Sequence, residues 1–255
     1  MKTILVTCDG GVTTVLLNRP EVRNAFNDTM VSELREVFTN LDKSTRAVVL
    51  TGAGKAFCAG ADLNWMKQSV SYTQEENATD AGAMVGLFRA INECPIPVIG
   101  RVNGAALGGG VGLISCCDMV VASDRAKFGL TEVRLGLVPA VISPFVLGKI
   151  PKAEARRYFL TGEIFSAEAA QKMGLVQKVV SLETLDQAVK LWTDALASNG
   201  PNAVREAKRL VFEISDRATD DALQFAVDVI ARLRVSPEGQ EGLAAFLEKR
   251  EPNWK

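Results

Sequence analysis

Apolar residues follow two different patterns along the first 195 residues of the chain. Over residues 28–41 they recur at helical spacing, which predicts a helix, whereas over 12–17 they form a short run typical of a strand. Further strands are predicted over 47–51, 96–102 and 119–122, and further helices from about 63, over 75–92 and from the glycines at 108–110 to about 117. Strands that alternate with helices in this order indicate an α/β domain.

Strand signals end at about residue 195, and three helical patterns follow, over 201–214, 220–233 and 237–249. Pro201 and Pro237 stand where first-turn prolines belong. The middle helix carries an apolar stripe that the rest of the chain or another subunit must cover: Leu223, Ala226, Val227, Ile230 and Leu233. We therefore divide the chain into a core over 1–195 and a helical region over 196–255.

The composition is that of an ordinary globular protein with ample material for a buried core. Hydrophobic residues make up 47% of the 255 residues, and the mean hydropathy is +0.11. The net charge of -1 provides no overall positive field that would hold nucleic acid or an anionic membrane. The sequence contains neither a membrane-length apolar run nor a secretory signal, so we expect a cytoplasmic protein.

Histidine is absent from the sequence, which excludes imidazole-based triads and histidine-ligated metals. The five cysteines contain no Cys-x-x-Cys spacing, and we expect them to be buried, reduced thiols and not metal ligands. Proton transfer must then rely on Glu, Asp, Lys, Tyr, Cys or water.

Two glycine-containing turns before predicted helices are the first candidate site. Amides at the start of a helix lack partners and lie at the positive end of its dipole, so Gly109 and Ala61 could donate to an oxygen that becomes negative. Each such donor is worth about 2.7 to 4 kcal/mol in a transition state. The alternative is that the glycines at 108–110 only allow close packing. A lone carboxylate, Glu132, follows in a separate segment.

Four ordered segments resemble the enoyl-CoA hydratase/isomerase (crotonase) family: 18–26, 55–63, 102–113 and 128–136, with a similar ending over 246–250. The resemblance implies a ClpP-like core of stacked ββα turns and a C-terminal helical region that forms trimers or dimers of trimers. It also implies an acyl-CoA substrate. Coenzyme A then enters only as part of that substrate, and no metal or redox cofactor is required.

The resemblance also implies roles for particular residues. Ala61 and Gly109 would hold the thioester oxygen, and Glu132 would be the catalytic acid/base. Arg23 would lie near a CoA phosphate and Ala25 near the adenine. The implied substrate-binding set is Arg23, Ala25, Ala61, Asp62, Leu63, Asn64 and Gly109, together with Phe246 and Lys249, which would reach a CoA bound to a neighbouring subunit.

One position departs from the family's pattern. Gly112 stands where two-glutamate hydratases carry their other carboxylate, and Ala140 lacks the acid of dienoyl-CoA isomerases. Glu132 could therefore hydrate a 2-enoyl thioester alone, or act as the single base of a 3,2-enoyl-CoA isomerase. A non-catalytic acyl-CoA- or RNA-binding relative is the third alternative. If the cleft has room, Gly112→Glu should raise the hydration of crotonyl-CoA.

Finer similarities favour hydration. Residues 61–67, 109–113 and 137–144 look like bacterial methylglutaconyl-CoA and carboxygeranoyl-type hydratases of leucine and acyclic terpene breakdown. That resemblance implies a branched acyl group with its own carboxylate, which Lys67 or Arg101 could neutralise.

Overall fold

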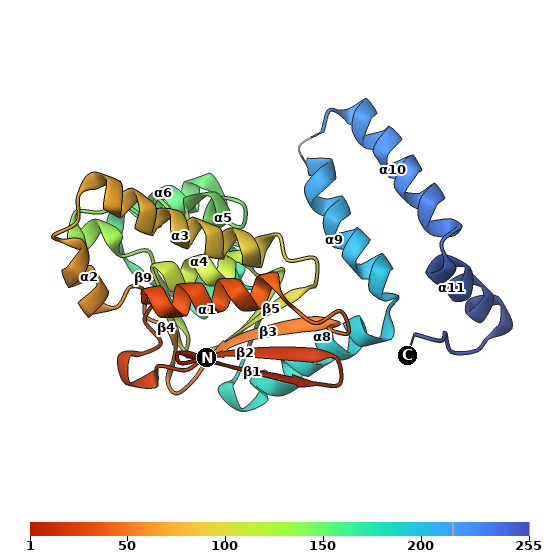
Figure 1. Ribbon diagram of the computed structural model, residues 1–255, viewed down its shortest axis with the longest axis horizontal. Helices are drawn as coiled ribbons and strands as arrows, with labels where there is room; N and C mark the ends of the chain where they lie inside the picture. The colour runs from red at the N-terminus through yellow and green to blue at the C-terminus, as the bar shows by residue number, and fades with distance from the viewer. Residues whose placement is uncertain (216, 255) are drawn as a thin grey trace.

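Two mixed β-sheets form the centre of the computed structural model, which describes residues 1–215 and 217–254 (Figure 1). The larger sheet has the order β1-β2-β3-β5-β7-β10. Its strands are β1 (Ile4–Asp9), β2 (Val12–Leu17), β3 (Ala47–Gly52), β5 (Val98–Val102), β7 (Met119–Ser123) and β10 (Lys178–Val180). Strands β1 and β2 form an antiparallel hairpin, and the other neighbours are parallel, with Val48 of β3 opposite Val98 of β5.

The smaller sheet has the order β4-β6-β8-β9 and is built from three-residue strands: β4 (Ala56–Cys58), β6 (Ala105–Leu107), β8 (Lys127–Gly129) and β9 (Ile164–Ser166). The first three are parallel, and β9 is antiparallel to β8. Three times in succession, a strand of the larger sheet is followed by a strand of the smaller sheet and then by helical chain. This order produces the stacked strand–strand–helix turns that we predicted.

Helices cover both faces of the larger sheet, so its central strands β3, β5 and β7 are almost entirely buried, as parallel strands usually are. On one side lie α1 (Asp28–Thr39), α3 (Gln74–Asn92) and α4 (Gly109–Cys116), which pack in that order (Figure 1). On the other side, α8 (Leu185–Ser198) packs against Val49, Ile99 and Val121. The remaining core helices are α2 (Leu63–Ser69), α5 (Ser143–Leu147), α6 (Lys152–Thr161) and α7 (Ala167–Lys172), with 3-10 turns η1 (Pro20–Val22), η2 (Glu132–Leu135) and η3 (Leu182–Thr184).

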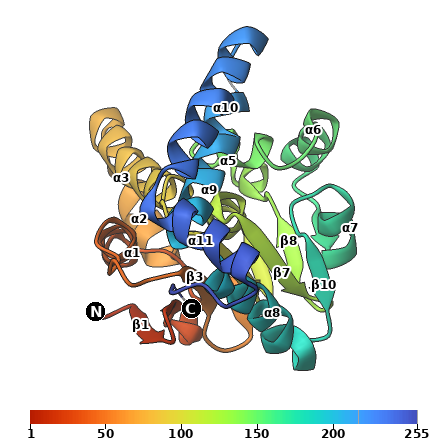
Figure 2. The ribbon, with the colours of Figure 1, turned by 90° about the vertical axis from the view of Figure 1, so that its right-hand side faces the viewer.

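The last three helices stand away from the sheets (Figure 1), and in the perpendicular view α10 projects beyond the rest of the molecule (Figure 2). They are α9 (Pro201–Ser215), α10 (Thr219–Arg234) and α11 (Pro237–Glu248), close to the predicted bounds. The Lys208 ammonium of α9 lies 2.7 Å from the Asp118 carboxylate of the core. Along α10 the apolar stripe is largely uncovered, since Leu223 is 62% exposed and Val227 57%.

The structure also contains elements that the sequence patterns did not predict, namely β1, β10, the smaller sheet's strands, and the helices between residues 143 and 198. Three-residue strands are too short to display a periodicity. The boundary proposed at residue 195 lies inside α8.

Four of the five cysteines are buried, as expected, and all five are free thiols. Cys8 is exposed, contrary to the expectation, because it lies on the outer hairpin. No helix among the described residues is both long and apolar enough to cross a membrane.

Candidate active site

The first part of the site is the glycine turn, residues 108 and 109, between β6 and α4. Gly108 has a φ of +49° and donates to the Gly129 carbonyl over 2.8 Å. A Cβ at Gly109 would lie 2.7 Å from the Phe26 ring, and one at Gly110 would lie 2.4 Å from the Cys58 oxygen. The glycines are therefore required for close packing. That packing is compatible with a binding role, because Gly109 begins α4 and its amide has no partner within the helix.

The second part is the Ala61 turn, residues 60–62, between β4 and α2. Phe26 donates to the Gly60 carbonyl over 2.7 Å and accepts from the Asp62 amide over 2.8 Å. Backbone groups alternate in direction along an extended chain, so this pairing with Phe26 leaves the Ala61 amide directed elsewhere. Within the described residues, neither Ala61 nor Gly109 donates a backbone hydrogen bond. A Cβ at Gly60 would be 3.1 Å from the Leu107 oxygen, which places the two turns side by side.

Glu132 lies against the glycine turn. It is the first residue of η2, and its Oε1 atom is 3.1 Å from the position of a Cβ at Gly108. Its Oε2 atom is buried and has no hydrogen-bond partner among the described residues. Burial raises the pKa of Glu132 above its ordinary value. The structure thus brings a poorly solvated carboxylate close to two amides that donate no backbone hydrogen bond among the described residues, which is the arrangement that the family resemblance implied.

This arrangement can stabilise negative charge on an oxygen and move a proton beside it. Two preorganised amides favour an oxygen that gains charge during the reaction. A carboxylate whose pKa is raised by burial is a stronger base than an ordinary glutamate and remains able to return a proton. Proton transfer next to an activated carbonyl, or addition of water to its conjugated double bond, is the chemistry that these groups permit.

A buried ionic network, which no sequence pattern indicated, holds the Ala61 turn. The Arg19 guanidinium lies 2.7 Å from the Asp62 carboxylate and also donates to the Ala25 carbonyl. Asp62 accepts from the Asn64 amide and caps α2. Burial alone would raise the pKa of Asp62, but Arg19 and the Asn64 amide outweigh it and lower the pKa. Arg19 lies in the segment 18–26 that resembles the family, and a charged residue directly before Pro20 was the sequence feature that could have pointed to this network.

Comparison with known proteins agrees with this geometry. The family model described as "Enoyl-CoA hydratase/isomerase" matches residues 7–255. The chain belongs to that family. It is 34% identical to the crotonyl-CoA hydratase of Syntrophomonas wolfei over 99% of this chain and 98% of the relative. The 2,3-dehydroadipyl-CoA hydratase of Escherichia coli is also 34% identical, over 100% of this chain and 99% of the relative.

Solved structures give the same result for the fold. A crystal structure of an enoyl-CoA hydratase from Shewanella pealeana superposes with a TM-score of 0.95 and 40% identity, covering 99% of this chain and 96% of that one. The chain therefore has the α/β crotonase fold, with two mixed sheets and C-terminal helices, and the fold prediction is confirmed.

Within this enoyl-CoA hydratase/isomerase family member, Gly112 is enclosed by apolar side chains. A Cβ at this position would lie 2.3 Å from Ile142 Cγ2 and 2.9 Å from the Phe88 ring. Ile142 and Phe88 are themselves 3% and 0% exposed. The condition for Gly112→Glu to raise hydration is therefore not met, because a glutamate would overlap Ile142 and place a charge among apolar groups.

The predicted CoA-contacting residues fall into two groups. Arg23, Leu63 and Asn64 are exposed close to the Ala61 turn, and Arg23 adopts a left-handed φ of 56°. Ala25 and Asp62 are buried, and their polar groups already bind Arg19. The role proposed for Asp62 is thus accompanied by a structural one.

Phe246 and Lys249 lie at the end of α11, which is on the opposite side of the molecule from α2 (Figure 1). Both are exposed, and a single chain does not bring them to the Ala61 turn. Their proposed contact with CoA therefore depends on a second subunit.

Arg101 does not face the site. Its guanidinium is 2.6 Å from Asp186 of α8 and also donates to the Thr51 hydroxyl, on the opposite face of the larger sheet. The expectation that Arg101 neutralises a substrate carboxylate is therefore wrong. Lys67 is exposed on α2 and stays a candidate for that role.

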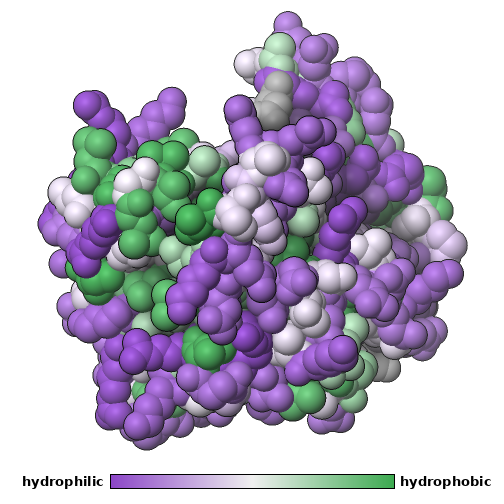
Figure 3. All heavy atoms as spheres, turned by 60° about the vertical axis from the view of Figure 1, so that its left-hand side comes forward, coloured by the Kyte–Doolittle hydropathy of each residue, from purple (hydrophilic) through white to green (hydrophobic). Residues whose placement is uncertain are grey.

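Exposed apolar side chains surround the site's outer surface. Figure 3 shows a large apolar area on the side that carries α2, α6 and β9. Its exposed members on these elements and on the chain after Glu132 are Leu63, Leu135, Leu137, Val138, Leu160 and Ile164. Patches of this kind mark binding surfaces.

Proposed function

We propose that this protein is an enoyl-CoA hydratase, which adds water across the 2,3-double bond of an enoyl-CoA thioester. The proposal rests chiefly on Glu132, whose Oε1 atom lies beside the glycine turn and whose Oε2 atom is buried without a hydrogen-bond partner among the described residues. Family membership supports it, because the two relatives described above are named as hydratases of enoyl-CoA thioesters.

In the proposed reaction, the thioester oxygen accepts hydrogen bonds from the Ala61 and Gly109 amides. Glu132 takes a proton from water, and the oxygen of that water forms a bond to C3. The electron pair of the double bond moves toward C1, and the resulting enolate oxygen is stabilised by the two amides. Glu132 then gives its proton to C2, so one carboxylate serves as base and acid.

We propose a short or branched acyl group, such as that of 3-methylglutaconyl-CoA, as the substrate. This choice rests on the resemblance of the segments near residues 61, 109 and 137 to hydratases of that kind. The two relatives are equally similar to the chain but are named for crotonyl-CoA and 2,3-dehydroadipyl-CoA, so their names support the reaction more than the acyl group.

A 3,2-enoyl-CoA isomerase is the second candidate, and the surroundings of Gly112 favour it. Ile142 and Phe88 leave no polar side chain at the position of a second carboxylate. A single base is sufficient to move a proton from C2 to C4, whereas hydration also requires Glu132 to activate a water molecule.

Incubation with crotonyl-CoA, 3-methylglutaconyl-CoA and 3-hexenoyl-CoA separates the candidates. A hydratase consumes the conjugated thioester and incorporates ¹⁸O from labelled water at C3, which mass spectrometry detects. An isomerase creates the conjugated thioester from 3-hexenoyl-CoA without taking up label. Binding of all three without turnover would instead favour a non-catalytic acyl-CoA-binding protein.

We further propose that the protein is cytoplasmic and forms a homotrimer or a dimer of trimers. The core over 1–195 would carry out catalysis, and the helical region over 196–255 would mediate association. The uncovered stripe of α10 and the position of α11 support this proposal. Light scattering gives the mass of the assembly. If Phe246 and Lys249 complete a neighbour's CoA site, Lys249→Ala should raise KM without lowering kcat.

A further inference from the structure

Three apolar side chains lie behind the glycine turn: Ile142, Phe88 and Phe145. We call them the apolar wall. Ile142 and Phe88 lie against Gly112 on the side toward which a Cβ would project. The centroids of the Phe88 and Phe145 rings are 5.9 Å apart. On its other side, Phe88 meets the Phe26 ring edge-on, with centroids 6.3 Å apart. Continuous packing therefore joins the glycine turn to α5.

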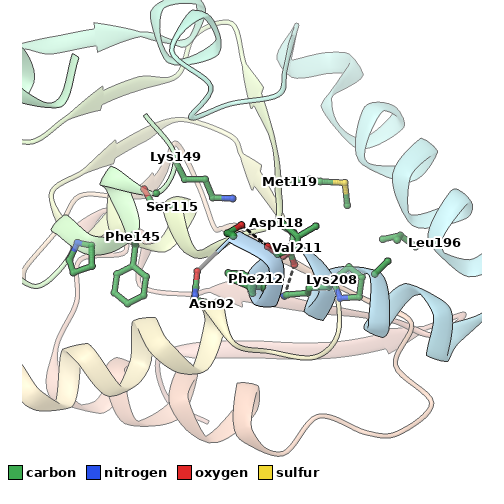
Figure 4. Close-up of a pocket in the computed structure, with 15 residues that line it drawn as sticks. Asn92, Ser115, Asp118, Met119, Phe145, Lys149, Leu196, Lys208, Val211 and Phe212 are labelled. Carbon is green, nitrogen blue, oxygen red and sulfur yellow. Dashed lines mark hydrogen bonds and ion pairs between the residues drawn. The ribbon is translucent and has the colours of Figure 1, made fainter. Parts of the chain in front are cut away.

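A large cavity lies beyond the wall, between α4, α5 and α9 (Figure 4). Its volume is about 800 Å³, and its lining includes Ser115, Phe145, Lys149 and Phe212. In Figure 4, Phe145 stands at the end of the cavity away from Leu196. Phe145 thus has one side on the cavity and one on Phe88. Neither Gly109, Glu132 nor Ile142 lines this cavity.

The distance from the glycine turn to the wall limits the acyl group. Gly112 is one helical turn beyond Gly109 on the same face of α4, which corresponds to about 4.5 Å along the helix axis. Carbon–carbon bonds are about 1.5 Å long, so this distance spans roughly three to four bonds from the carbonyl carbon. An acyl chain bound at Gly109 would meet Ile142 at about C4 or C5.

We propose that Ile142, supported by Phe88 and Phe145, ends the acyl pocket and makes the protein selective for acyl chains of about four or five carbons, because the wall separates the site from the cavity. This inference rests on the proposed acyl-CoA site. It names Ile142 as the residue that determines chain length.

Binding of saturated acyl-CoAs measures this selectivity without requiring turnover. Isothermal titration calorimetry of the full-length protein with butyryl-CoA and octanoyl-CoA gives the ratio of their dissociation constants. We expect octanoyl-CoA to bind the unmodified protein about tenfold more weakly, because the additional methylenes meet a packed wall. Ile142→Ala opens the wall toward the cavity and should shift the ratio by about tenfold in favour of octanoyl-CoA.

Ile150→Ala is the matched control, because Ile150 is buried to the same degree, 4% against 3% exposed, but does not contact Gly112. It should lower the melting temperature without changing the ratio. Ile142→Val, which removes one methyl group, is the variant to use if Ile142→Ala does not fold. It should shift the ratio in the same direction by a smaller factor.

Two outcomes overturn the inference: octanoyl-CoA binding the unmodified protein as tightly as butyryl-CoA, or Ile142→Ala and Ile150→Ala changing the ratio equally. A preference for butyryl-CoA that Ile142→Ala removes supports the inference even if the protein hydrates no enoyl-CoA. That last result would count against the proposed function only.

Discussion

The two turns that present free amides are held in different ways. The glycine turn depends on the absence of side chains, since the Phe26 ring, the Cys58 oxygen and Glu132 occupy the space around it. The Ala61 turn depends on polar contacts, because Arg19 binds the Asp62 carboxylate next to it.

This difference shows that equivalent donors can rest on unlike physical support. Packing around a glycine tolerates no added atom, because protein interiors are dense and neighbouring backbone cannot move cheaply. An ionic network can lose one member and retain part of its geometry. We therefore expect substitutions at the glycine turn to be more damaging than substitutions in the network.

Glu132→Gln should have the largest effect. It tests whether the carboxylate that lies against the glycine turn is the catalytic acid and base. The amide keeps the shape of the side chain but cannot accept the proton, so kcat should fall about a thousandfold. Affinity for butyryl-CoA, measured by calorimetry, should change little. Glu168→Gln, at an exposed site on α7, is the control and should retain full activity. Normal turnover by Glu132→Gln would place the base elsewhere.

Gly109→Ala should be next in size. Its Cβ would lie 2.7 Å from the Phe26 ring, so either the ring or the amide must move. Displacing one oxyanion donor lowers kcat by about a hundredfold. Gly82→Ala is the control, because its added methyl group would meet no atom within 4 Å, and steady-state kinetics should be unchanged. An active Gly109→Ala protein would contradict the importance of close packing here.

Arg19→Gln tests the polar support of the Ala61 turn and should lower kcat by roughly tenfold. Arg19 and Asp62 are 17% and 5% exposed, so loss of one partner leaves a buried charge unpaired and also lowers the melting temperature. Asp62→Asn and the double variant complete a cycle that gives the coupling. Arg89→Gln breaks an exposed pair with Glu93 and should have almost no effect. If Arg19→Gln were more damaging than Gly109→Ala, the comparison between the turns would be reversed.

The pH dependence of stability should show the smallest effect. Because the pKa of Glu132 is raised in the folded protein, the unfolded chain releases this proton at lower pH. Glu132 therefore lowers stability as pH rises from about 4.5 to its folded pKa, and the loss persists above that value. Glu132→Gln should melt slightly higher than the unmodified protein at pH 7 but not at pH 4. Scanning calorimetry at both pH values measures this, and an equal difference at both would mean that the charge is not involved.

Most of the long elements could be predicted from the sequence alone. Helical spacing indicated α1 and α3 within two residues at each end, and prolines marked the starts of α9 and α11. Ala61, Gly109 and Glu132 were found as separate features, because a helix start and an isolated carboxylate are local properties. The family resemblance then placed them in one site.

Tertiary structure decided what surrounds these residues. Sequence could not show that Ile142 fills the space beside Gly112, that Arg101 turns to α8, or that Arg19 binds Asp62, because each contact joins segments that lie 30 to 85 residues apart. The pattern of amphipathic and glycine-rich segments therefore determined most of the long elements and the candidate oxyanion donors. The folded chain decided which groups are left free, since a hydrogen bond or a packed side chain depends on neighbours that only three-dimensional proximity supplies.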